Sequence, residues 1–91
     1  MSVDIATRFG ENLARCRRLA DLSQEELSLR ASVHRTEVSQ LERGMRIARI
    51  DTLVKLRDAL EVSADDLLAG IAWRSGHYRQ GGFSMDPEDE G

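Results

Sequence analysis

Residues 23–44, SQEELSLRASVHRTEVSQLERG, decide the fold of this chain. Their apolar positions predict one short helix over residues 24–31 and a second over residues 35–42. Residues 32–34 make the tight turn between them, with Val33 as its buried apolar plug. The stretch therefore predicts two helices that pack against each other across a turn.

Capping residues mark the ends of these helices. Ser23 followed three residues later by Glu26 is a capping box, which opens the first helix. His34 and Glu37 form a weaker version of the same pair at the start of the second helix. Gly44 ends that helix, because glycine readily takes the left-handed conformation that closes a helix.

The second predicted helix carries more polar side chains than a core can use. Val38 and Leu41 point inward, whereas the outward faces hold Arg35, Thr36, Glu37, Ser39 and Gln40. Two short helices joined by a tight turn, the second with a polar outer face, are typical of a helix-turn-helix, whose second helix enters the DNA major groove. The sequence thus favours a protein that reads DNA.

Three further helices complete the predicted fold. An apolar row over residues 4–20 predicts an amphipathic first helix, with residues Ile5, Phe9, Leu13, Cys16 and Ala20 inward and Arg8, Glu11, Asn12, Arg15 and Arg18 on its other faces. Apolar spacing over residues 51–60, and Ser63 with Asp66 before residues 64–69, predict the last two helices. We expect an all-α, compact five-helix domain over residues 1–70, without strands.

Residues 71–91 form a C-terminal extension of different character. It is rich in glycine and ends in an acidic string, so we expect most of it to be flexible. The first part of this extension, together with the fifth helix before it, is expected to form a dimer interface, with candidates Leu60, Val62, Leu68, Ile71 and Trp73. Leu60 and Val62 have the alternative of serving only the core of one chain.

Composition limits the function classes. A chain of 91 residues with one cysteine fits one small domain that has no intrachain disulfide and no Cys-rich metal site. Cys16 is expected to be a core residue, and we expect no metal and no cofactor. No catalytic constellation is visible, so an enzyme is not expected. No signal peptide or long apolar run is present, which predicts a cytoplasmic protein and no membrane contact.

The net charge of −3 does not exclude a nucleic-acid partner. The C-terminal residues 71–91 contribute −2 of this charge. Residues 35–49, by contrast, hold four arginines against two glutamates, which is a local charge of +2. DNA binding needs a basic face rather than a basic protein, so the sequence predicts salt-sensitive binding through this segment.

The chain resembles the Xre family, the helix-turn-helix type of the phage lambda repressor and Cro. The matching strings are Leu22-Ser23-Gln24-Glu25-Glu26-Leu27, Ala31, Val33, Val38-Ser39-Gln40-Leu41-Glu42-Arg43-Gly44 and residues 53–62. The resemblance covers about residues 5–70 and implies the lambda-repressor-like fold.

The resemblance also implies roles for individual side chains. Base reading falls to Arg35, Thr36 and Gln40, with Glu37 as a further candidate. Contacts to the DNA backbone fall to Gln24, Ser39, Arg43, Arg46 and Arg49. Arg17 and Glu42 match a structural salt bridge between the first and third helices, and Gln24 matches a glutamine that also braces the recognition helix.

The chemistry of these side chains agrees with base reading. The Arg35 fork suits guanine O6 and N7, Gln40 suits adenine N6 and N7, and Thr36 suits a base acceptor or a thymine methyl. Glu37 has two readings, acceptance from cytosine N4 or completion of the His34 cap. For the arginines and Gln24, the alternative is an ordinary solvated helix or loop residue.

The chain departs from the family pattern at several turns. Asp21, Ser32 and Glu61 stand where glycine is common, so turns that are more strained or differently shaped are expected there. His34 replaces a usual Ser or Thr, and Arg49 replaces a common capping residue before the fourth helix.

The resemblance implies a sequence-specific transcriptional regulator of bacterial or phage origin. It acts on double-stranded DNA as a homodimer on a palindromic operator, as a restriction–modification controller or a phage-type repressor. The alternative is an antitoxin or protein-binding module whose tail, with Trp73, Tyr78 and Phe83, orders on a protein partner.

Overall fold

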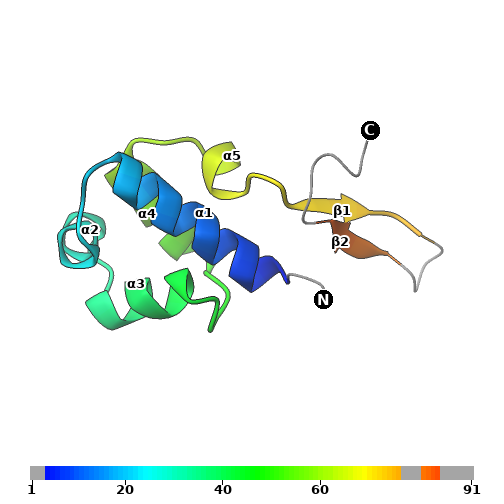
Figure 1. Ribbon diagram of the computed structural model, residues 1–91, viewed down its shortest axis with the longest axis horizontal. Helices are drawn as coiled ribbons and strands as arrows, with labels where there is room; N and C mark the ends of the chain where they lie inside the picture. Colours follow the sequence, from blue (N-terminus) through cyan, green and yellow to red (C-terminus); the bar gives the residue numbers. More distant parts are fainter. Residues whose placement is uncertain (1–3, 77–80, 85–91) are drawn as a thin grey trace.

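The computed structural model describes residues 4–76 and 81–84, in which five helices and one two-stranded antiparallel sheet are present. The elements are α1 (Ile5–Leu19), α2 (Gln24–Ala31), α3 (Arg35–Glu42), α4 (Ile50–Leu60), α5 (Ala64–Leu67), β1 (Ala72–Arg74) and β2 (Gly82–Ser84). The helices gather into one body, and the strands form a hairpin that projects from it near the start of α1 (Figure 1).

The core is largely aliphatic, includes Phe9, and lies between all five helices. α1 packs against α3 and α5, while α2 packs against α3 and α4. The fully buried apolar side chains are Leu13, Leu27, Val38, Leu41, Leu56 and Leu67. Cys16 belongs to this core, as predicted, and its burial raises the pKa of the thiol. α4 buries Leu56 and Leu60 together with Thr52, whereas Ile50 at its first position is exposed.

Local capping explains where α2 and α3 begin. The predicted capping box of α2 is present, because the Glu26 backbone N–H donates to Ser23 Oγ at 3.0 Å and the Ser23 N–H donates to the Glu26 carboxylate at 2.8 Å. That backbone bond holds the pKa of Glu26 below its ordinary value. His34 is the N-cap of α3, as predicted, and its Nδ1 accepts from the Thr36 N–H at 3.3 Å. The reciprocal bond predicted for Glu37 is not among the described contacts, so this half of the prediction is wrong.

Three turns adopt the left-handed conformation without glycine. Asp21, Ser32 and Glu61 have φ angles of 62°, 55° and 57°. These are the three positions at which the family pattern commonly has glycine. A Cβ atom in this conformation lies close to the following carbonyl oxygen and is disfavoured by about 1–2 kcal/mol. The chain therefore carries local strain at the ends of α1, α2 and α4.

Replacing Glu61 by glycine should relieve one of these strained turns. Glu61 is exposed and ends α4, so Glu61→Gly should raise the free energy of unfolding by about 0.5–1 kcal/mol. Glu61→Ala keeps the Cβ atom and should give no gain. Urea unfolding of the two variants checks this, and equal changes would show that backbone strain at Glu61 is not the cause.

Gly10 lets α1 approach the end of α3 closely. A Cβ atom at this position would collide with the carbonyl oxygen of Leu41 and lie 2.7 Å from that of Glu42. Both atoms belong to the backbone and cannot swing away. The spacing of the first and third helices thus depends on the absence of a side chain at Gly10.

Gly10→Ala should destabilise the fold, although alanine favours a helix interior by about 1 kcal/mol over glycine. The collision with α3 should outweigh this gain and lower the free energy of unfolding by about 1–3 kcal/mol. Gly82→Ala is the control, because a Cβ atom there meets nothing within 4 Å. Thermal unfolding measures both, and a stabilised Gly10→Ala protein would contradict the close approach.

Asn12 is buried, which corrects the expectation that it lies on an outer face of the first helix. Its side chain is 1% exposed, and its Nδ2 donates to the carbonyl oxygens of Leu67 and Ala69, both at 2.9 Å. Its Oδ1 accepts from Arg15 at 3.0 Å. Asn12 therefore ties α5 and the residues after it to the middle of α1.

The region after α5 also differs from the prediction. α5 is shorter than residues 64–69, since it ends at Leu67 with Leu68 as its C-cap. The chain then forms β1, which pairs with β2 so that Trp73 lies opposite Phe83. The expectation that the chain has no strands is therefore wrong for these residues. The acidic string at residues 85–91 and Tyr78 lie outside the described residues.

Burial divides the predicted dimer-interface residues into two groups. Leu60 is buried in the core, and Val62 and Ile71 are partly buried against the core. For Leu60 and Val62 this is the alternative role, in the core of one chain. Leu68 and Trp73 are exposed, at 37% and 59%. Of the five candidates, these two are the ones exposed to a second copy. Among the described residues, no helix is long and apolar enough to cross a membrane.

Candidate nucleic-acid interface

The outer face of α3 is polar and open to solvent, while its inner face is fixed in the core. Val38 and Leu41 are fully buried. Arg35 and Thr36 are exposed in the first turn, and Gln40 is partly exposed about one turn later. Ser39 and Arg43 follow Arg35 at steps of four, so they continue along its side of the helix. α3 thus presents a continuous row of hydrogen-bonding side chains.

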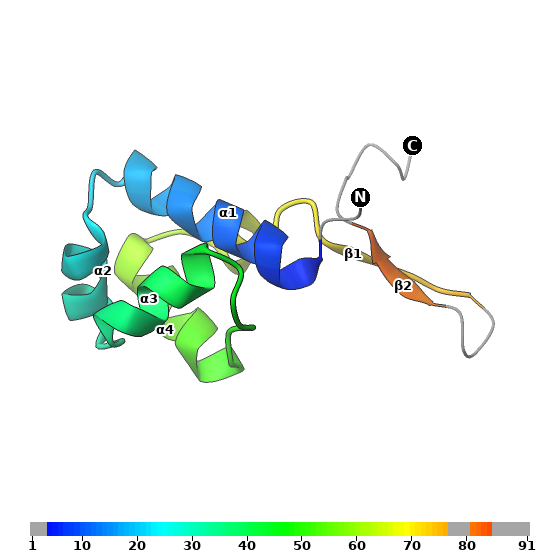
Figure 2. The same cartoon turned by 60° about the horizontal axis from the view of Figure 1, so that its bottom comes forward.

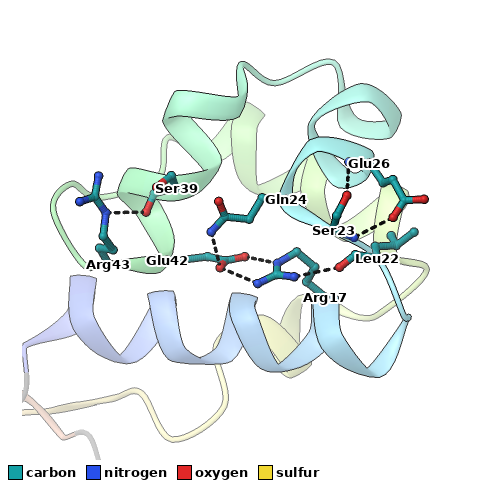
Figure 3. Close-up of polar contacts among 8 residues, drawn as sticks. All are labelled: Arg17, Leu22, Ser23, Gln24, Glu26, Ser39, Glu42 and Arg43. Carbon is teal, nitrogen blue, oxygen red and sulfur yellow. Dashed lines mark hydrogen bonds and ion pairs between the residues drawn. The ribbon is translucent and has the colours of Figure 1, made fainter.

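A buried carboxylate fastens the end of α3 to the rest of the domain (Figure 3). Arg17 on α1 donates to both oxygens of Glu42, with Nε to Oε2 at 2.6 Å and Nη2 to Oε1 at 3.0 Å. Their side chains are only 13% and 6% exposed. The hydrogen bonds to Glu42 raise the pKa of Arg17 above its ordinary value. The predicted salt bridge between the first and third helices is present.

The same cluster includes the start of α2 and the turn before it. Gln24 Nε2 donates to Glu42 Oε1 at 2.9 Å, and Arg17 Nη1 donates to the Leu22 carbonyl at 2.8 Å. Gln24 therefore braces α3, as the family resemblance implied. Its amide nitrogen has a second N–H, because a primary amide carries two donors. The cluster joins α1, α2 and α3 through one carboxylate.

Arginines flank α3 on the side of its C-terminus. Arg43 Nε donates to the Ser39 carbonyl at 3.4 Å, and Arg46 Nη1 donates to Gln40 Oε1 at 3.2 Å. Arg49 pairs with Asp51 at 3.4 Å and leaves α4 without a side-chain cap. All three arginines are exposed. These long contacts at the surface leave the guanidinium groups accessible to an anionic ligand.

Arg35 stands at the opposite end of α3, beside α2. Its Nη1 lies 3.9 Å from Glu25 Oε1, and both side chains are about two-thirds exposed, at 66% and 67%. An exposed pair at this distance contributes at most about 1 kcal/mol and does not hold the guanidinium in place. Arg35 is therefore free to turn toward a partner. Glu37 is partly exposed, with no hydrogen bond to His34 among the described contacts.

The structure brings most of the predicted DNA contacts together on α3 and the segments beside it. Figure 2 shows α3 in front of the body when the lower face comes forward. Gln24 donates to Glu42 and Arg46 donates to Gln40, so both side chains lie beside α3. Residues 4–76 and 81–84 contain no group of three or more His, Cys, Asp or Glu side chains that could hold a metal ion.

The family comparison agrees with this geometry. Residues 13–67 match the family HTH_3, described as helix-turn-helix, which includes the whole of α2, α3 and α4. The chain belongs to this helix-turn-helix family. The matched segment ends with α5, so the β-hairpin lies outside it.

Relatives within the helix-turn-helix family include control proteins. The chain is 36% identical over 69 residues to the control protein C.BamHI of Bacillus amyloliquefaciens. These residues are 75% of this chain and 85% of that relative. It is 36% identical over 66 residues to the control protein C.SmaI of Serratia marcescens, spanning 72% and 79%. The structure of the restriction-modification controller protein C.AhdI from Aeromonas hydrophila matches with a TM-score of 0.66 and 32% identity, over 68% of this chain and 94% of that one.

Removing the buried carboxylate should destabilise the domain more than removing an exposed one. Glu42→Ala leaves the Arg17 guanidinium largely buried and without its partner, so the free energy of unfolding should fall by about 3 kcal/mol. The matched control is Glu25→Ala, whose exposed carboxylate should contribute less than about 1 kcal/mol. Chemical denaturation measures both. Equal losses would show that the Glu42 cluster does not hold the helices together.

Proposed function

We propose that this protein is a transcriptional regulator that binds a specific sequence of double-stranded DNA with α3 in the major groove. The observation that carries the proposal is the division of α3 into two faces. Val38, Leu41 and Glu42 fix one face to the domain, whereas Arg35 and Thr36 stand exposed on the other. A rigidly held helix with outward donors suits the reading of base edges. DNA binding, rather than catalysis, is the proposed activity.

Each outward side chain fits one kind of contact. Arg35 suits guanine O6 and N7, Thr36 suits a base acceptor or a thymine methyl, and Gln40 suits adenine N6 and N7. Glu37 suits cytosine N4, since the capping contact that was its alternative is not formed. The DNA-backbone contacts are assigned to Gln24, Ser39, Arg43, Arg46 and Arg49.

The proposed active form is a homodimer on a palindromic operator. One recognition helix covers only a few base pairs, so one copy has limited affinity and specificity. Two copies related by a twofold axis read half-sites about one helical turn, roughly 34 Å, apart. The exposed Leu68 and Trp73 supply apolar surface for such an assembly.

The similarity to two control proteins and to the restriction-modification controller protein C.AhdI favours a controller of a restriction–modification system over a phage-type repressor. Such a regulator works where the chromosome is, so we place it in the bacterial cytoplasm at the nucleoid. The acidic background of the chain makes affinity depend on the few arginines beside α3, and binding should weaken steeply with salt.

Arg35→Ala tests the base-reading role. The variant should lose about 1–3 kcal/mol of binding to the selected operator and much less on random DNA, because a base contact adds discrimination. Arg57→Ala on α4 is the control and should bind both DNAs like the wild type. Fluorescence anisotropy with labelled duplexes measures the affinities. Equal losses of affinity for Arg35→Ala on both duplexes would show that Arg35 contacts only the DNA backbone.

A further inference from the structure

The β-hairpin carries an aromatic pair that the helical body does not cover. The Trp73 and Phe83 rings meet edge to face, with centroids 5.2 Å apart and planes at 74°. They remain 59% and 55% exposed. The hairpin points away from the helices in both views (Figures 1 and 2). It also lies beyond residues 13–67, so the family fold does not require it.

Such a hairpin gains little stability by itself. Its strands are only three residues each, and an isolated two-stranded hairpin is at best marginally stable in water. Two exposed aromatic rings on such an element favour a covering surface, because burying an aromatic side chain contributes more than any other contact the hairpin offers.

A matching surface exists on the same chain. A hollow of about 100 Å³ is lined only by apolar side chains: Ile5, Ala6, Phe9, Ile47, Ala48, Leu53 and Leu68. Ile47 and Leu68 at this site are 65% and 37% exposed. A closed cavity of about 150 Å³ accommodates benzene, so an open hollow of this size suits the edge of an aromatic ring. The hollow includes the start of α1 and the residue after α5.

We propose that Trp73 and Phe83 of one copy insert into the hollow of a second copy, and that the exchange is mutual. The inference rests on the homodimer of the proposed function. A second copy is favoured because one chain carries both halves of the contact, while its own hairpin points away from its own body. A twofold axis then forms two equal contacts at once.

Charge supports the same occupant. The hollow and the aromatic pair carry no charged group, so their contact desolvates no charge. The exposed Arg74 belongs to the hairpin, and the exposed Asp4 directly precedes Ile5 at the hollow, so the two elements carry opposite charges close in sequence to the proposed contact.

Trp73 is itself the probe for the test, since it is the single tryptophan of the chain. Sedimentation of the full chain without DNA gives the dimer dissociation constant. Tryptophan emission is then recorded across the same concentrations. As the dimer forms, the emission should shift to shorter wavelength and become protected from a soluble quencher, because the half-exposed indole becomes buried.

Matched variants separate the hairpin from general apolar surface. Trp73→Ala should raise the dimer dissociation constant at least tenfold, whereas Leu29→Ala, at a side chain 74% exposed on α2, should leave it within twofold. Gly81→Ala should weaken the dimer too, because the new Cβ atom collides with the Trp73 ring and displaces it. The neighbouring Gly82→Ala adds a Cβ atom in open space and should have no effect.

The contact between copies is tested by a double-mutant cycle of Trp73→Ala and Leu68→Ala. If Trp73 reaches Leu68 of the other copy, the double variant should lose less than the product of the two single losses. A dimer that forms and binds a palindromic site while Trp73 emission stays unchanged would overturn the hairpin exchange and leave the regulator intact. A chain that stays monomeric at all concentrations and on DNA would overturn both.

Discussion

The carboxylate of Glu42 holds α1, α2 and α3 in one arrangement. It accepts from Arg17 on α1 and from Gln24 at the start of α2, and it sits at the last residue of α3. An ionised group that is only 6% exposed is tolerated only when its oxygens are paired, and here three donors satisfy them. The position of α3 therefore depends on partners from two other helices, and a shift in either would leave a buried charge unpaired.

This arrangement also separates support from recognition. Apolar packing by Val38 and Leu41 and the bond to Glu42 occupy one side of α3, so no outward side chain is needed for folding. Gly10 brings α1 against the end of α3, which fixes the spacing as well as the orientation. Because α3 is held through its inner face, its outward residues can change without loss of the fold. The DNA sequence that α3 recognises can change with them. Affinity then depends on a local basic face on a chain whose net charge is −3.

Short-range signals in the sequence predicted the helix-turn-helix of α2 and α3 well. The bounds of α2 and α3 follow from Ser23, His34 and apolar spacing within one or two turns, and these patterns are visible in the sequence. The left-handed turns at Asp21, Ser32 and Glu61 followed from the family pattern. The bond predicted between Glu37 and His34 is not among the described contacts. The His34 ring accepts from the nearer N–H of Thr36, and apolar periodicity cannot reveal which N–H a cap will choose.

Long-range contacts were not predictable in this way. Its polar side chain predicts a surface position for Asn12, yet its acceptors belong to Leu67 and Ala69, more than fifty positions along the chain. A signal was present, since Asn12 lies between Phe9 and Cys16 at helical spacing. The hairpin was missed because three-residue strands are too short for an alternating pattern, and its glycines indicated flexibility. DNA contacts of single side chains remain predictions that exposure and position support.

Selection of binding sites from a random pool of double-stranded DNA, near physiological salt, tests the central claim most directly. A dimeric reader that uses α3 should recover a palindrome whose half-sites lie about ten base pairs apart, centre to centre. Recovery of no enriched sequence, from protein shown to be folded by circular dichroism, would contradict sequence-specific regulation by this helix-turn-helix.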